Sequence, residues 1–126
     1  MADPASSDGP ARLLIVSTDA DLVDGVKLSS RDHLEVVDAT DARSAFQAMN
    51  ERVPSVVVVS IQAGSAGGFA LAREMAADQR LASIPLLMLL ERDQDEWLAR
   101  QAGAAATRTL PISGEELVGA ALALIV

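Results

Sequence analysis

Apolar and polar positions divide the chain into two alternating kinds of segment. The first kind is a short, continuous apolar run such as SVVVVS or IPLLMLL, with no polar residue at every second position. Such runs are typical of strands that are covered on both faces of a parallel sheet. The pattern predicts strands at 12–16, 33–39, 55–60, 84–90 and, more weakly, 105–110.

The segments between these runs carry apolar residues three or four positions apart, which predicts helices. Asp41 is a good N-cap, Gly103 suits a C-cap, and Ser113 with Glu116 matches a capping box. Pro54 is expected to end the second helix. The predicted helices are 21–30, 41–53, 68–80, 93–103 and 113–126.

Strict alternation of strands and helices predicts an α/β fold. Right-handed crossovers would give a single five-stranded parallel sheet, doubly wound, with five helices on its two faces. Residues 1–11 are polar and contain proline, and we expect a disordered leader there. Residues 12–126 then form one domain, whose ligand site should lie at the carboxyl ends of the strands.

Composition narrows the range of functions. The formal net charge is −8, and Lys27 is the only lysine, so we expect no direct binding to nucleic acid. No apolar run is long enough to span a membrane, and no signal peptide is apparent, which favours the cytoplasm. Cysteine is absent and His33 is the only histidine. Few catalytic groups therefore remain, and we predict no enzymatic activity, no cofactor and no metal.

Four segments together resemble the receiver domain of response regulators in two-component signalling. PSVVVVSIQAGSAGGFAL is similar to the family's third-strand segment, with Pro54, Gly68, Phe69 and Leu71 in the expected places. LLIVSTDADL resembles the first strand and its acidic loop, IPLLMLL the fourth strand, and AGAAATRTLP the fifth. The resemblance covers nearly the whole chain after residue 11 and implies a flavodoxin-like, receiver-type fold.

The chain departs from the family where phosphoryl chemistry would occur. The family forms an acyl phosphate on an aspartate, holds Mg²⁺ with an acidic pair, and contacts the phosphoryl group with a hydroxyl and a lysine. None of the matching positions keeps the family's residue, and only Asp19, with Asp21, retains negative charge nearby. The matching residues are Ser17 and Thr18 for the acidic pair, Ser60 for the nucleophile, Leu90 for the hydroxyl and Leu110 for the lysine.

These replacements are consistent with one another. A serine cannot form an acyl phosphate, and without the anion and the metal a buried lysine would be an unpaired charge. We therefore interpret Ser60 chiefly as a small polar residue at a strand end. We favour this interpretation over a Ser/Thr kinase target or a catalytic serine. Asp19 and Asp21 are expected to cap the following helix rather than bind a cation alone. Leu90 and Leu110 either pack against each other or line an apolar pocket.

Two further expectations follow from the resemblance. The bond between Leu110 and Pro111 is expected to be cis, as it is in the family. A face made by 93–103, 105–110 and 113–126 would carry contacts to a protein partner or a second copy, through Trp97, Thr107 and Arg108.

Trp97 lies about 100° around the helix from Leu98, which is expected in the core with Ala102. Trp97 should therefore be partly exposed.

The sequence thus predicts a degenerate pseudo-receiver that signals through protein contacts without phosphorylation. Three alternatives remain open. One is a small-molecule sensor using a vacated pocket around Ser17, Ser60, Leu90 and Leu110. Another is an active enzyme or phosphoacceptor. The third is the N-terminal regulatory domain of a longer transcription regulator.

Overall fold

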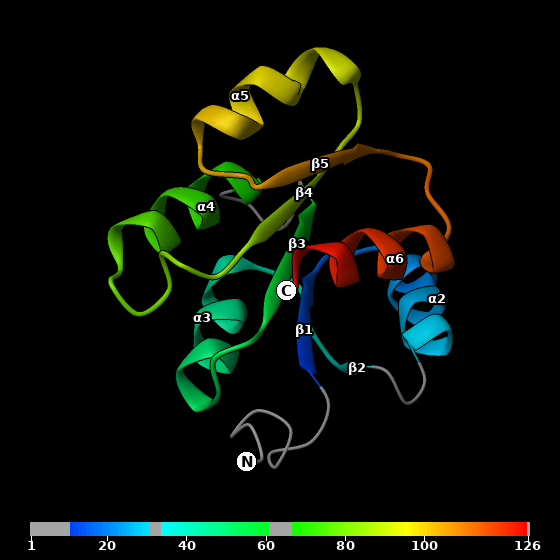
Figure 1. Ribbon diagram of the computed structural model, residues 1–126, viewed down its shortest axis with the longest axis horizontal. Coiled ribbons are helices and arrows are strands. Elements are labelled where there is room, and N and C mark those ends of the chain that lie inside the picture. Colours follow the sequence, from blue (N-terminus) through cyan, green and yellow to red (C-terminus); the bar gives the residue numbers. More distant parts are fainter. Residues whose placement is uncertain (1–10, 31–33, 61–66, 126) are drawn as a thin grey trace.

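The computed structural model describes residues 11–30, 34–60 and 67–125. Within them, five parallel strands form one sheet in the order β2-β1-β3-β4-β5 (Figure 1). The predicted fold class is confirmed. The strands are β1 (Ala11–Val16), β2 (Leu34–Ala39), β3 (Val56–Ser60), β4 (Leu86–Leu90) and β5 (Ala106–Thr109).

Five α-helices cover the two faces of this sheet (Figure 1). The helices α2 and α6 lie together on one face, whereas α3, α4 and α5 lie on the other. A short 3₁₀ turn, η1 (Asp93–Asp95), leads directly into α5. The helices are α2 (Ala20–Ser30), α3 (Ala42–Glu51), α4 (Gly67–Ala77), α5 (Glu96–Gln101) and α6 (Gly114–Leu124).

Two hydrophobic clusters hold the layers together. Alternate residues of each central strand face opposite layers, so Val57 and Val59 join the cluster under α3, α4 and α5, and Val56 and Val58 join the one under α2 and α6. All four valines of β3 are fully buried. A strand covered on both faces needs apolar side chains at every position, which explains the unbroken VVVV run.

Several local predictions are confirmed. Asp41 caps α3 and accepts the backbone N–H of Ser44, whose hydroxyl accepts the N–H of Asp41 in return. The Ser113 hydroxyl accepts the N–H of Glu116 at the beginning of α6. Gly103 has a φ of 113°, a left-handed conformation that glycine adopts without strain, just after α5 ends.

Other predictions need correction or lie outside the described residues. The first strand begins at Ala11, so the leader predicted for 1–11 overlaps it by one residue; positions 1–10 are not described, and neither are His33 and the loop 61–66. The helix predicted from 41 to 53 already ends at Glu51, ahead of Pro54.

The prediction that Leu98 faces the core is wrong. Leu98 is 49% exposed, and Ala99 is fully buried with Ala102 close to it in the core. The short α5 therefore turns its small alanines toward the core. Trp97 is 67% exposed, as expected for a residue outside that buried stripe.

Candidate functional site at the carboxyl edge of the sheet

The parallel register brings the sequence-predicted site residues to one edge of the sheet. Val16 of β1 pairs with Val59 of β3, and Ser17 and Ser60 are the next residues on these two neighbouring strands. Ser60 in turn pairs with Leu89 of β4. Leu90 pairs with Thr109, which Leu110 follows. Neighbouring strands are about 4.8 Å apart. The residues at the five matching positions therefore lie along one edge of the sheet.

The side chains of Ser17 and Asp19 accept hydrogen bonds from nearby backbone N–H groups. Ser17 is buried; its N–H donates to the Ala39 carbonyl (2.9 Å), and its hydroxyl accepts the Asp19 N–H (3.0 Å). One carboxylate oxygen of Asp19 accepts the N–H of Leu22 (3.2 Å), which caps α2. This hydrogen bond gives Asp19 the capping role that the sequence predicts. Thr18 is exposed.

Nothing in the described part of the chain assembles a metal-binding cluster. Among residues 11–30, 34–60 and 67–125, no group of three His, Cys, Asp or Glu side chains could hold a metal ion. Ser17 and Thr18 provide neutral hydroxyls where the family has its acidic pair. Mg²⁺ dehydrates reluctantly and prefers carboxylate oxygens. The residues present therefore do not fit the family's magnesium site.

Leu90 and Leu110 belong to opposite faces of the sheet. Leu90 is almost completely buried in the cluster under α3, α4 and α5, while the half-buried Leu110 packs against the cluster under α2 and α6. Instead of the expected side-chain contact, the Leu110 N–H donates to the Leu90 carbonyl (2.7 Å). The Leu110–Pro111 peptide bond is cis, as predicted.

A cavity of about 570 Å³ opens beside this edge, between the beginnings of α2 and α6. Leu110 lines it, together with Leu22 and Ile112. Ser17, Ser60 and Leu90, which the sequence placed around a vacated pocket, are not among its lining residues. The cavity therefore lies on the α2 and α6 side of the predicted site.

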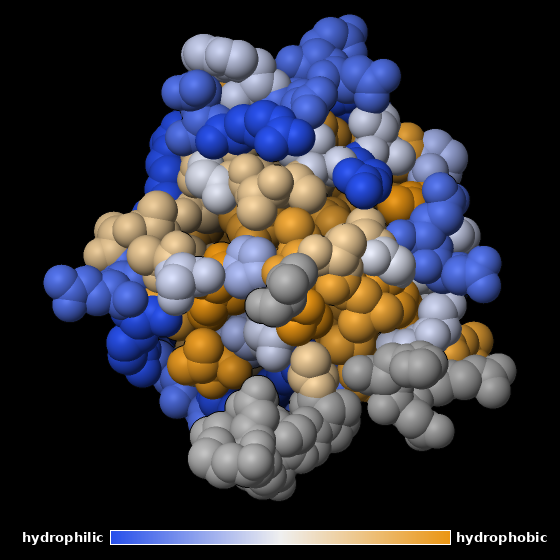
Figure 2. Space-filling model, in the orientation of Figure 1, coloured by the Kyte–Doolittle hydropathy of each residue, from blue (hydrophilic) through white to orange (hydrophobic). Residues whose placement is uncertain are grey.

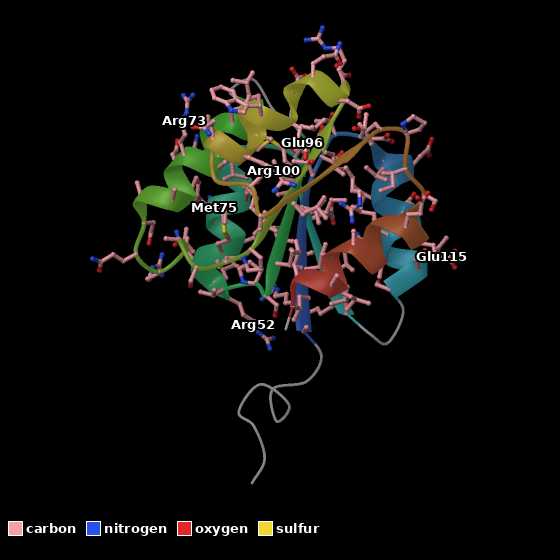
Figure 3. The ribbon with its side chains drawn as sticks, turned by 45° about the horizontal axis from the view of Figure 1, so that its top comes forward. Arg52, Arg73, Met75, Glu96, Arg100 and Glu115 are labelled. Carbon is pink, nitrogen blue, oxygen red and sulfur yellow. The ribbon has the colours of Figure 1, made fainter. Side chains whose placement is uncertain are left out.

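The second predicted site is the face formed by α5, β5 and α6. Figure 2 shows apolar side chains gathered over the middle of the face on which β5 and α6 lie. Trp97 and Leu98 on α5 and Leu122 on α6 are exposed. Thr107 is half-buried, and exposed Arg108 donates to its carbonyl (2.7 Å). Glu96 and Arg100 form an ion pair along α5 (3.1 Å; Figure 3).

Among the described residues, two side chains have perturbed pKa values, and neither belongs to the predicted phosphoryl pocket. Hydrogen bonding to Asp38, together with its negative charge, raises the pKa of Lys27 above its usual value. The Lys27 ammonium and the Asp38 carboxylate are 2.8 Å apart. Hydrogen bonds from the backbone and hydroxyl of Ser44 lower the pKa of Asp41. These pairs stabilise helix ends and the edge strand β2.

Comparison with known proteins agrees with this geometry. A putative response regulator from Chloroflexus aurantiacus superposes with a TM-score of 0.85 over 92% of this chain and 98% of its own, at 23% identity. The chain has the receiver fold of response regulators. The chemotaxis response regulator CheY4 of Vibrio cholerae is similar (TM-score 0.84, 19% identity, 91% of this chain and 98% of that one).

Two transcriptional regulatory proteins are similar to the chain in sequence. The transcriptional regulatory protein PhoP of Escherichia coli is 31% identical over 118 residues, 90% of this chain and 52% of PhoP. The virulence regulator PhoP of Salmonella choleraesuis is 32% identical over 117 residues, 90% of this chain and 51% of that protein. The chain thus spans about half the length of the curated relatives it matches. Together these likenesses support the receiver fold.

One structural neighbour contains a bound magnesium ion. The receiver domain of the sensor histidine kinase PA1611 from Pseudomonas aeruginosa has a magnesium ion coordinated in its active-site cleft; it matches with a TM-score of 0.80 at 17% identity, over 93% of this chain and 98% of that one. No protein-family model matches the chain. None of the described helices is both long and apolar enough to cross a membrane.

Some cavity-lining residues and contacts at this edge of the sheet were not predicted from the sequence. Ile112 and Gly114 line the cavity but follow the fifth strand without any motif. The Thr109 hydroxyl donates to Asp93 in η1 (2.5 Å), across sixteen positions of sequence. Asp19, Asp21 and Leu110, which the sequence analysis had singled out, also line the cavity.

Proposed function

We propose that this chain is a receiver domain that does not accept a phosphoryl group and that signals through protein contacts. It would belong to a two-component or related regulatory pathway and would not act as an enzyme. The observation that carries the proposal is the set of residues at the carboxyl edge of the sheet. Hydroxyls and aliphatic side chains stand at the positions where the family has two metal-binding acids, a nucleophilic aspartate, a hydroxyl and a lysine.

The chemistry of the missing step supports this proposal. An acyl phosphate requires a carboxylate nucleophile, and Ser60 offers a hydroxyl that would need an adjacent base to react at all. Leu110 contributes no positive charge to hold phosphoryl oxygens. A buried lysine at that position, without an anion and a metal, would cost several kcal/mol. Loss of all the charged groups together is what a receiver freed from phosphorylation would require.

Contacts would then be made by the exposed apolar residues of the α5, β5 and α6 face. Trp97 supports this assignment, because large exposed aromatic residues are enriched among the residues that dominate binding energy at interfaces. The occupant would be a protein partner or a second copy of the chain. Since the curated relatives are about twice as long, an output domain following this one in a longer transcription regulator fits the same proposal.

Phosphorylation provides the direct test. The purified protein is incubated with acetyl phosphate and Mg²⁺, and its intact mass is measured. We expect no change in mass. A receiver domain that carries the family's acidic residues, treated in parallel, checks that the reagent is active. A gain of one phosphoryl group that hydroxylamine removes would overturn the proposal, because hydroxylamine cleaves acyl phosphates and leaves phosphoserine intact.

A further inference from the structure

The cavity between α2 and α6 has a floor and a rim of different chemistry. Leu22, Leu110 and Ile112 form its less exposed part and pack against the α2 and α6 cluster. The exposed Asp19, Asp21 and Glu91 form its rim. Its volume of about 570 Å³ is within the range of small-molecule sites, roughly 300–1,000 Å³. An apolar floor with a few charged groups at the rim is the usual composition of such sites.

We propose that this cavity binds a small aliphatic ammonium cation. The ammonium group would lie among the rim carboxylates and the hydrocarbon chain over the leucine and isoleucine floor. The site goes beyond the protein-contact function proposed above and does not depend on it. It also differs from the apolar pocket that the sequence suggested, since the ligand must be charged.

The charge at the rim determines the sign of the ligand. Among the residues that the structure describes, three carboxylates line the cavity, and no lysine or arginine does. Among the ion pairs of the described residues, none includes Asp19 or Asp21. The beginnings of α2 and α6 each contribute about half a positive charge. Two such helix ends offset only about one of the two formal negative charges of Asp19 and Asp21, so the rim remains attractive to a cation.

The same residues disfavour a bare metal ion. No three acidic side chains within 11–30, 34–60 and 67–125 form a group able to hold one. One oxygen of Asp19 is also committed to the N–H of Leu22. Separated carboxylates around an apolar floor suit a larger cation with a hydrocarbon body, whose charge can be contacted from more than one side. The floor would bury that body and add to the affinity.

The test compares three ligands of equal chain length: hexylamine, hexanol and hexanoate. Each is titrated into the protein by calorimetry near neutral pH, and chemical shifts of the Leu22, Leu110 and Ile112 methyl groups locate the binding. We expect hexylamine to bind, to shift these methyl groups and to raise the melting temperature. Hexanol should bind weakly because it lacks the charge, and hexanoate should not bind because the rim repels it.

Two charge-removing variants on the same helix complete the test. Asp21→Asn should weaken hexylamine binding about tenfold, the size expected for one charge-assisted contact. Asp24→Asn, also exposed on α2 but outside the cavity lining, should bind as the wild type does. Equal affinity for hexanol and hexylamine, or equal effects of the two variants, would overturn the proposal. Stabilisation by magnesium chloride that Asp21→Asn abolishes would also overturn it, because the site would then be a metal site.

Discussion

Gly114 at the beginning of α6 rests directly on the backbone of Gly25 in the middle of α2. A Cβ atom added to Gly114 would lie 2.3 Å from the Gly25 carbonyl oxygen and 2.9 Å from the Val26 nitrogen. The atoms it would meet belong to backbone, which cannot move aside as a flexible side chain can. This contact sets how closely α2 and α6 approach, beside the cavity that Gly114 also lines.

Replacing Gly114 by alanine should therefore destabilise the protein. The added methyl group forces the two helices apart, at an expected loss of about 1–3 kcal/mol in the free energy of unfolding. Urea unfolding measures this loss. Gly119→Ala in the same helix is the control, since nothing lies within 4 Å of its added Cβ. That variant should gain about 0.5–1 kcal/mol from the lower chain entropy. Similar effects at both glycines would contradict the close approach.

Leu90 and Leu110 should respond differently to truncation. Leu90 is 1% exposed within a packed cluster, so Leu90→Ala leaves a cavity and should cost about 2–5 kcal/mol. Leu110→Ala should cost clearly less, because that side chain is half-buried and already borders open space. Chemical unfolding of both variants gives the comparison. Equal losses would contradict the different burial of the two side chains.

The cap of α3 should make stability depend on pH in the acid range. Hydrogen bonds from Ser44 lower the pKa of Asp41 from its usual value of 3.8. The folded pKa is thus below the unfolded one, and the carboxylate contributes stability above pH 3.8 that is lost as pH falls through the folded pKa. Unfolding of wild type and Asp41→Asn across this range should show their difference shrinking on acidification.

The variant Ser44→Ala provides a second check on that cap. It keeps the backbone N–H that donates to Asp41 and removes the hydroxyl donor (2.8 Å). The acid-dependent part of the stability should therefore become smaller without disappearing. A difference between wild type and Asp41→Asn that stays constant with pH would refute the role given to this carboxylate.

Trp97 should matter for binding and little for folding. Because its side chain is 67% exposed, Trp97→Ala should change the free energy of unfolding by no more than about 0.5 kcal/mol. The same variant should lose proteins that the wild type captures from an extract of the native cell, or lose self-association in sedimentation experiments. Leu28→Ala is the matched control, because Leu28 is a 70% exposed apolar residue on α2, away from this face. If both variants behave as wild type, the α5, β5 and α6 face is not the interface.

Much of the fold could be predicted from local pattern. Unbroken apolar runs such as Val56 to Val59 identify strands buried on both faces, and the caps at Asp41 and Ser113 mark helix beginnings because each satisfies backbone N–H groups nearby. The composition of the carboxyl edge also followed from sequence. Parallel strands end at a common edge, so the predicted strand ends were enough to place Ser17, Ser60 and Leu110 along that edge.

Only the tertiary structure decided which face of the sheet each side chain packs against and where a cavity remains between the helices. Leu98 is exposed and Ala99 buried because the rotation of a short helix depends on how it packs against the rest of the fold, which no local pattern encodes. Leu90 and Leu110 separate onto opposite faces because neighbouring strand residues alternate in direction. The approach of Gly114 to Gly25 and the acid-rimmed cavity beside it arise from packing between helices far apart in sequence. Local sequence determines elements through hydrogen bonding and periodicity, whereas cavities and contacts depend on how those elements fit together in space.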